Sequence, residues 1–231
     1  MKFYSGICFD ESGISTSIRA MHLQTELMSN ISKNITGFDK VGYQREESVI
    51  SSFSEYIGPH ALSVVKDESV GRLYNSGNSL DFALAKPGYF QCQTKNGIKL
   101  NRDGRFKLDK NGNLLTLDDN KVLSKDGTAI KFNKIPQSLS DIKVGVNGDI
   151  TAFDRETNKT TKIASFSVVS SNGSLSEDPD VRQGFVETSN VKMHEEVFNL
   201  VPVRRNFDAN RQMIVTQNDE LTKAIQELGR A

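Results

Sequence analysis

Few residues in this sequence have the type and spacing of metal ligands. The best candidate, a run that resembles a calcium-binding loop, lacks two of the residues that such a loop requires. The run DKNGN at residues 109–113 begins like a calcium loop, which needs oxygen ligands at alternate positions. The glycine required at the sixth position of such a loop is Leu114, and the glutamate required at the twelfth is Asn120. We therefore interpret this run as a polar hairpin turn and expect neither a metal site nor a cofactor.

The three histidines do not form the clusters that zinc binding or acid–base catalysis needs. His194 precedes two glutamates, but Phe198 stands where a zinc helix would carry its second histidine. His22 and His60 have no ligand cluster around them, and a solvated helix surface is the expected place of His22. No phosphate-binding glycine loop and no nucleophile elbow occurs in the sequence.

Hydrolysis of a glycan would need two carboxylates that face one another across the substrate. Glu187, Glu195 and Glu196 are candidates by residue type alone, and the last two are neighbours on a helix surface that do not face one another. We predict no catalytic residues and no enzymatic activity.

Composition limits the classes of partner. The 231 residues are 36% hydrophobic and 25% charged, and 29 basic residues balance 29 acidic ones. No global field therefore favours nucleic acid or an anionic membrane, and no run of 18 apolar residues could insert into one. We expect no nucleic-acid binding and no membrane insertion, so partners must be recognised by shape.

The N-terminus and the cysteines bear on export and on disulfides. Residues 1–10 lack the basic start, apolar run and cleavage site of a secretory signal, which predicts a chain made without a cleaved leader. Cys8 and Cys92 are too few for a disulfide framework. We expect two free thiols, with a single bridge between them as the alternative.

Two apolar stripes at helical spacing, one near each end of the chain, are the elements that would position any functional surface. Each stripe is narrow and contains polar positions, so neither helix buries enough apolar surface alone and each needs a partner. This predicts an assembly subunit. The N-terminal stripe contains Ile14, Ile18, Met21, Thr25, Met28, Ile31 and Ile35, and the C-terminal stripe contains Leu200, Val203, Phe207, Asn210, Ile214, Gln217, Leu221, Ala224 and Leu228.

We predict the apolar members of both stripes, other than Ala224, as the assembly interface. The first helix should begin near residues 10–12, which offer capping side chains, and end at Gly37 in a left-handed C-cap. Pro202 leaves two alternatives for the second helix: it begins at this proline, or it kinks there.

Turn chemistry dominates the middle of the chain. Five Asn-Gly or Asp-Gly pairs, whose glycines are Gly97, Gly104, Gly112, Gly127 and Gly148, supply the positive φ angles of tight β-turns. The predicted class is α+β: terminal helices packed as a coiled-coil-like pair, with a central antiparallel β domain. The expected parts are a helical segment at 1–37 that forms a core with 191–231, an extended arm at 38–70, a β domain at 71–187 and a C-terminal helix at 188–231.

Four strings, in order along nearly the whole chain, resemble those of the bacterial flagellar basal-body rod family, which is related to hook and other axial proteins. They are MSNISKNITGF at 28–38, GNSLDFAL with PGYF at 77–90, NRDGRFKLDKNGNL at 101–114 and QGFVETSNV at 183–191. The motif residues are Asn34, Thr36, Gly37, Phe38, Leu80, Asp81, Gly88, Phe90, Arg102, Gly104, Phe106, Asn111, Gly112, Gly184, Glu187, Ser189, Asn190 and Val191.

The resemblance implies a structural subunit of the periplasm-spanning rod. Such subunits reach the growing axis through the flagellar type III export apparatus and assemble with themselves and with other rod and hook subunits through their terminal helices. This chain departs from the family pattern at Ser29, Ser32 and Lys33, where alanines are usual, and at Pro202. A second hypothesis remains from the residues alone: a stand-alone β-domain binding module on a coiled-coil oligomerisation stalk.

Overall fold

A computed structural model describes residues 13–50, 62–136, 138–155 and 157–229. The chain forms two compact units. The first, called here the helical unit, contains the described residues up to Ile35, the segment Glu46–Lys66 and the segment from Lys192 onward. The second, called the β unit, contains Thr36–Arg45 and Asp67–Val191. The chain therefore passes between the units four times.

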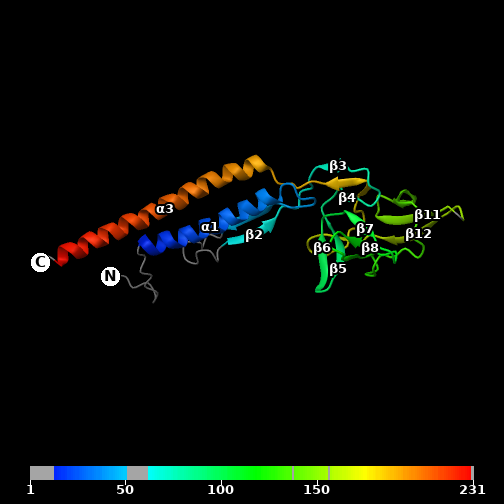
Figure 1. Ribbon diagram of the computed structural model, residues 1–231, viewed down its shortest axis with the longest axis horizontal. Coiled ribbons are helices and arrows are strands. Elements are labelled where there is room, and N and C mark those ends of the chain that lie inside the picture. The colour runs from blue at the N-terminus through cyan, green and yellow to red at the C-terminus, as the bar shows by residue number, and fades with distance from the viewer. Residues whose placement is uncertain (1–12, 51–61, 137, 156, 230–231) are drawn as a thin grey trace. The chain divides into compact units, whose positions relative to one another are not determined.

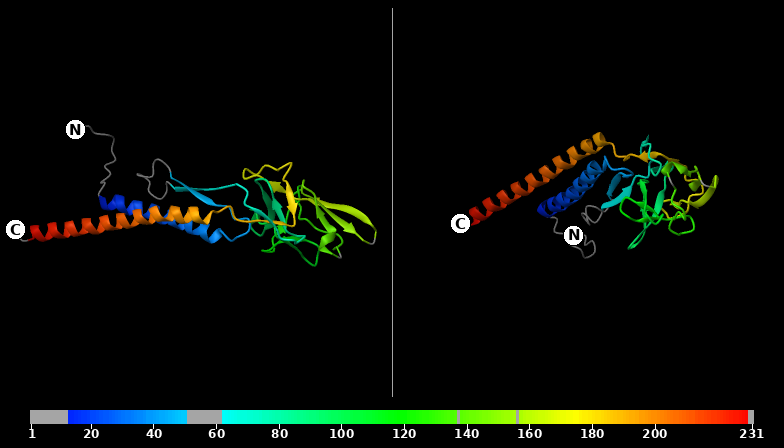
Figure 2. Two further views of the ribbon diagram at one scale, coloured as in Figure 1. Left: turned by 90° about the horizontal axis from the view of Figure 1, so that it is seen from above. Right: turned by 45° about the vertical axis from the view of Figure 1, so that its right-hand side comes forward.

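The helical unit combines two helices with a two-stranded sheet (Figures 1 and 2). Helix α1 spans Gly13–Gly37, with its last two residues in the β unit, and helix α3 spans Met193–Leu228. Strands β1 (Glu46–Ile50) and β2 (Leu62–Lys66) pair antiparallel. Both strands lie within 38–70, the segment expected to be an extended arm.

The helix ends agree with the prediction in part. Helix α1 ends at Gly37 as expected, but this residue does not adopt a left-handed conformation; the nearest positive φ belongs to Gly42, at 65°. The expected capping residues 10–12 lie outside the described residues. Helix α3 begins at Met193 and continues through Pro202, so the alternative in which it begins at the proline is wrong.

The β unit contains short antiparallel strands in small sheets. In chain order they are β3 (Leu73–Asn75), β4 (Phe82–Leu84), β5 (Tyr89–Thr94), β6 (Gly97–Asn101), β7 (Phe106–Leu108), β8 (Leu114–Thr116), β9 (Lys121–Val122), β10 (Ile142–Val144), β11 (Asp149–Asp154), β12 (Lys159–Ser165), β13 (Val168–Val169), β14 (Val181–Gln183) and β15 (Phe185–Glu187). A 3-10 turn, η2 (Leu139–Asp141), precedes β10. These elements confirm the α+β class with antiparallel sheets and one helix toward each end.

The largest sheet has the order β13-β5-β9-β8-β7, with β6 added on β5, and a second sheet has the order β10-β11-β12. Two further pairs, β14 with β4 and β15 with β3, join segments about a hundred residues apart. Residues just before the C-terminal helix are thereby tied into the start of the β unit.

Four of the five predicted glycine turns have the expected backbone. Gly97, Gly112, Gly127 and Gly148 all have positive φ angles. Gly104 does not, and that prediction is wrong: a Cβ atom at this position would lie 1.7 Å from the carbonyl oxygen of Phe82. Glycine is needed there because two backbones approach closely, which no local pattern reveals.

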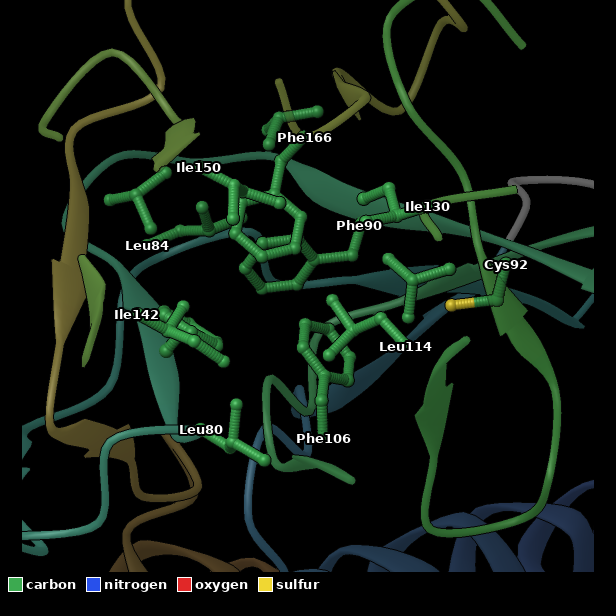
Figure 3. Close-up of a cluster of buried hydrophobic side chains, with 14 of the residues drawn as sticks. Leu80, Leu84, Phe90, Cys92, Phe106, Leu114, Ile130, Ile142, Ile150 and Phe166 are labelled. Carbon is green, nitrogen blue, oxygen red and sulfur yellow. The ribbon is translucent and has the colours of Figure 1, made fainter. Parts of the chain in front are cut away.

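The core of the β unit contains five buried phenylalanine side chains, three of which, Phe90, Phe106 and Phe166, are labelled in Figure 3. The rings of Phe90 and Phe106 have centroids 5.3 Å apart in an edge-on arrangement, and Phe166 lies 5.3 Å from Phe90. Such geometry is favourable for aromatic pairs. Cys92 is buried in the same core as a free thiol, and its burial raises its pKa to about 12. Cys8 lies outside the described residues.

Candidate assembly interface

The two helices of the helical unit contact each other through polar side chains at three levels. Near the end of α1, Asn34 Nδ2 donates to Glu196 Oε2 at 3.3 Å. Midway, Asn210 Nδ2 donates to Gln24 Oε1 at 3.4 Å. At the start of α1, Gly13 faces Gln217, whose side chain occupies the space that a Cβ would need. The contacts run in opposite directions along the two helices, so the pair is antiparallel.

Asn34 joins three segments of this unit. Its Nδ2 donates to the carbonyl oxygen of Glu46 at 2.8 Å, and its Oδ1 accepts from the Glu46 backbone N–H at 2.9 Å. One turn earlier, Asn30 donates to the same carbonyl and to Ser48 Oγ. An amide side chain that pairs with both backbone groups of one strand residue satisfies buried polar atoms that would otherwise destabilise the fold. Asn34 therefore holds β1 against α1.

Glu196 is buried, so the prediction that it lies on the helix surface beside Glu195 is wrong. Its side chain is only 1% exposed, whereas Glu195 forms an exposed ion pair with Lys192. Glu196 lies in the first turn of α3, where the unpaired N–H groups of the helix favour a carboxylate. The N–H donor of Asn34 adds to this stabilisation.

The predicted stripe of α3 is half-buried along the helix pair and then becomes exposed. Leu200, Val203, Phe207 and Ile214 are partly covered. Beyond Gln217 the predicted stripe residues Leu221 and Leu228 are 53% and 79% exposed. Ile225, which was not among the predicted stripe residues, is 69% exposed beside them. Gly13, the first described residue of α1, is level with Gln217, so among the described residues α1 has no counterpart for this end. We call Leu221, Ile225 and Leu228 the open seam.

A groove lies where the open seam begins. It has a volume of about 390 Å³ and is lined by Gly13, Ile14, Gln217, Glu220, Leu221 and Ala224. On the opposite helix Ile18 is 44% exposed, while Ile14, Met21, Met28, Ile31 and Ile35 are half-buried. A second apolar group, Val197, Phe198 and Val201, is exposed near the start of α3. The apolar residues of both helices are thus incompletely covered.

In the β unit, the motif residue Arg102 forms a buried ion pair with Glu187. Its Nε atom lies 2.6 Å from Glu187 Oε2, and the two side chains are 3% and 4% exposed. The remaining N–H groups of Arg102 donate to the carbonyl oxygens of Leu84, Lys86 and Gly88. Because the planar guanidinium presents donors in several directions, one side chain fixes the β4–β5 connection and β15 together.

The motif residue Asn190 ties together three passages of the chain. Its Oδ1 accepts from the Arg45 N–H at 2.7 Å, and its Nδ2 donates to the carbonyl oxygens of Asp67 and Ser69. Nearby, Tyr89 donates its hydroxyl proton to Gln44 at 2.6 Å. All of these residues belong to the β unit. The segments through which the chain enters and leaves this unit are therefore bonded to one another.

The other motif residues have mostly structural places. Gly37 packs against Tyr43, since a Cβ would lie 2.5 Å from the tyrosine ring. The DKNGN run forms the polar turn expected of it. Asp109 accepts from the side-chain amide of Asn113 and from the backbone N–H groups of Asn113 and Asn111, and these bonds lower the Asp109 pKa. Leu80, Asp81, Gly88, Phe90, Phe106, Gly112, Ser189 and Val191 are buried, Gly184 has a positive φ, and Thr36 and Phe38 are exposed.

The candidate metal and catalytic residues do not converge. Among the described residues no group of three or more His, Cys, Asp or Glu side chains could hold a metal ion. His22 and His194 are exposed, and His60 lies outside the described residues. Glu187 is bound by Arg102, and Glu196 by Asn34. No helix within the described ranges is long and apolar enough to cross a membrane.

Comparison with known proteins finds two family profiles along this chain. Residues 83–152 match the family profile described as the flagellar hook protein FlgE/F/G D1 domain, and residues 182–227 match that of the flagellar basal body rod FlgEFG protein C-terminal. The chain belongs to the flagellar basal-body rod family. This family is structural and not enzymatic, in agreement with the prediction.

Relatives in the rod family extend over nearly the whole chain. The chain is 26% identical to the flagellar basal-body rod protein FlgF of Rhizobium meliloti, over 95% of this chain and 98% of the relative. It is 27% identical to the rod protein FlgG of Bacillus subtilis, over 87% and 83%, and 27% identical to FlgG of Buchnera aphidicola subsp. Acyrthosiphon pisum, over 91% and 96%. Rod-family membership supports a structural subunit located in the flagellum.

Proposed function

We propose that this rod subunit assembles through its terminal helices, which form coiled-coil-like contacts with neighbouring copies and with other rod and hook subunits. The flagellar type III export apparatus delivers the chain without a cleaved signal peptide. The rod then forms an axial tube across the periplasm, with the helices toward its axis. The contacts of this assembly are the predicted stripe residues on α1 and α3, together with Ile225.

The observation that carries this proposal is the open seam of α3. Fully burying an exposed leucine or isoleucine side chain stabilises a protein by about 1.5–3 kcal/mol. Three such residues stand mostly in water, in phase with residues that are half-covered by α1. A neighbouring helix that covers them gains several kcal/mol of association free energy, which favours assembly over the monomer.

The polar contacts between α1 and α3 support the same proposal. An asparagine or glutamine at a helix–helix seam stabilises less than an apolar residue does, but it specifies which residues face each other. Gln24, Asn34, Asn210 and Gln217 occupy such positions. The helix pair thus has a defined register while its apolar residues are incompletely covered, as expected of a unit completed by its neighbours.

The test compares two substitutions with the same change of charge. Ile225→Asp places a carboxylate in the open seam, and the control Gln226→Asp places one on the adjacent exposed position. Both purified variants should unfold within about 0.5 kcal/mol of the parent, because both sites are exposed. Cells with Ile225→Asp should lack complete rods and fail to swim, whereas cells with Gln226→Asp should swim normally. Normal swimming with Ile225→Asp would refute the proposal.

Export is tested separately. The chain should be found in the periplasmic fraction of a strain that has the flagellar export apparatus but cannot complete its rods. It should be absent from the periplasmic fraction of an otherwise identical strain that lacks the apparatus.

A further inference from the structure

The start of helix α3 carries an apolar patch on the face that points away from α1. Val197, Phe198 and Val201 are 46%, 72% and 45% exposed. Glu196, which contacts Asn34 of α1, marks the side of α3 that faces that helix. At 3.6 residues per turn, the patch is centred roughly 150° around α3 from Glu196. We call Val197, Phe198 and Val201 the back patch.

The back patch has the composition of a protein–protein contact. Phe198 is the most exposed phenylalanine among the described residues. Arg204 and Arg205 follow Val201 within about one helical turn; both are exposed and form no ion pair with a described residue. Aromatic residues and arginine are enriched at protein interfaces, and clustered apolar side chains with a polar rim mark interaction sites. The back patch is therefore a second candidate contact on α3, separate from the open seam.

The open seam lies near the other end of α3. Its three residues continue the side of α3 that faces α1, past the described start of that helix (Figures 1 and 2). Glu220, on the groove wall, and Glu227 stand beside the two ends of the seam. Both carboxylates are exposed and form no ion pair with a described residue. The two apolar surfaces thus occupy opposite ends and nearly opposite faces of one helix.

The charges on α3 favour contact between these two different surfaces. The segment 197–208 around the back patch is net positive, and the segment 217–228 around the open seam is net negative. A contact of either surface with its own counterpart on a second copy joins segments of the same net charge, whereas a contact of one with the other joins opposite charges. The first segment contains Arg204, Arg205 and Asp208, and the second contains Asp219, Glu220, Glu227 and Lys223.

We propose that the back patch of one copy of this chain covers the open seam of a second copy. Phe198 then packs against Ile225, because these residues lie near the middle of the two surfaces. Glu220 and Glu227 stand at the two ends of the seam, so one of them meets the arginines beside the back patch in either orientation of the helices. This assignment rests on the proposed function and names the surface of the neighbour that covers the open seam.

A contact between two different surfaces can be repeated from copy to copy. Each copy in such a series leaves one surface free at each end of the assembly, and a further copy can bind there. Three side chains on each helix bury less than the roughly 1,000 Å² of a stable interface. The contact is therefore weak between two free chains, and the other contacts of each subunit reinforce it in the rod. Its tests accordingly use assembled basal bodies.

Photo-cross-linking tests the pairing directly. A benzophenone amino acid in place of Phe198 keeps an aromatic side chain and should join to residues 221–228. Within one chain these positions are roughly 35 Å or more from Phe198 along the same helix, so such a link must connect two copies. The same amino acid in place of Ile225 should join to residues 197–205. Links to any other part of the chain or to another protein, or no link, would overturn the proposal.

Two substitutions at adjacent exposed positions separate this inference from the proposed function. Phe198→Asp places a carboxylate in the back patch, and the control Asn199→Asp places one about 100° around the helix. Both purified variants should unfold at the urea midpoint of the parent. Cells with Phe198→Asp should fail to swim, and cells with Asn199→Asp should swim normally. If Phe198→Asp swims normally while Ile225→Asp does not, the proposed function stands and the role of the back patch is refuted.

Charge reversal tests the role of the arginines. One variant carries Arg204→Glu with Arg205→Glu, and another carries Glu220→Lys with Glu227→Lys. Each should reduce the number of complete rods counted by electron microscopy, because like charges then meet at the contact. A chain with all four substitutions restores opposite charges and should recover rods toward the parent number. Unchanged rod numbers in the two variants, or no recovery in the combined chain, would contradict the proposed pairing.

Discussion

Replacing Arg102 by methionine should remove a large part of the stability of the β unit. The substitution introduces an unbranched apolar side chain but leaves the Glu187 carboxylate buried, with the Gly71 N–H as its remaining donor among the described residues. Three carbonyl oxygens also lose their donors. Removing one partner of a buried ion pair destabilises proteins by about 3–5 kcal/mol. Because whole domains are stable by about 5–15 kcal/mol, this loss is severe.

The second partner provides the control. Glu187→Leu leaves the Arg102 cation buried, but its N–H groups keep three carbonyl acceptors, so we expect a smaller loss of about 2–3 kcal/mol. The double variant has no buried charge at either position. Its loss of unfolding free energy should be smaller than the sum of the two single losses by at least about 1.5 kcal/mol. Each single variant is destabilised by an unpaired buried charge, and the double variant has none.

Thiol labelling can follow unfolding of the β unit specifically. The chain has no tryptophan for fluorescence, but Cys92 is buried in the aromatic core and reacts with a thiol reagent only when the unit opens. In a Cys8→Ser background, the urea dependence of Cys92 labelling gives the free energy of opening. An Arg102→Met chain within about 1 kcal/mol of the parent, or strictly additive losses in the double variant, would refute the account of this ion pair.

Two further predictions concern local packing and pH. Gly37→Ala should lower the free energy of unfolding, because the added Cβ would overlap the Tyr43 ring. Alanine normally stabilises a helix by about 1 kcal/mol relative to glycine, so in a Tyr43→Ala background the same substitution should be neutral or stabilising. Thermal melting measures both effects. Burial raises the Cys92 pKa to about 12, whereas a thiol in an unfolded chain has a pKa of roughly 8.5. As the pH rises, the unfolded chain therefore loses this proton before the folded chain does. The free energy of unfolding should fall by about 2 kcal/mol between pH 7 and pH 10. Urea unfolding followed by circular dichroism should show this fall in the parent and not in Cys92→Ala; equal falls in both would contradict it.

Local sequence patterns predicted the features that depend on neighbouring residues in the sequence, namely the apolar face of a helix and the tight β-turns. The stripe on α3 marks the face that is partly covered by α1, and four Asn-Gly or Asp-Gly pairs form turns with positive φ. Gly37 and Gly104 were also recognised as important, but for the wrong reason. Each is a glycine because a residue outside its own turn, Tyr43 or Phe82, approaches its backbone closely. Turn chemistry can be read from two adjacent residues, whereas a close approach depends on the tertiary fold.

Buried polar residues were the main feature that sequence reasoning missed. A glutamate on a helix is exposed in most proteins, so Glu196 was assigned to the surface. Its burial depends on Asn34, which is 162 residues away in the sequence. The clue was Asn34 itself, a polar motif residue just before the end of a helix with apolar neighbours. Hydrophobic periodicity cannot identify the partner of such a residue, because it describes the faces of a single helix or strand and not the contacts between elements.

The motif residues and the proposed assembly residues divide between two physical tasks. Arg102, Glu187 and Asn190 satisfy buried groups inside one unit, so substituting them should unfold that unit before any assembly is attempted. Ile225 and Leu228 contribute little to the isolated chain because they are exposed. The strings that resemble the family therefore explain how the subunit folds, and the residues proposed to join subunits carry no comparable string. Any helical side chain that is apolar and in phase can cover a neighbour, whereas only arginine can bind one carboxylate and three carbonyls at the same buried position.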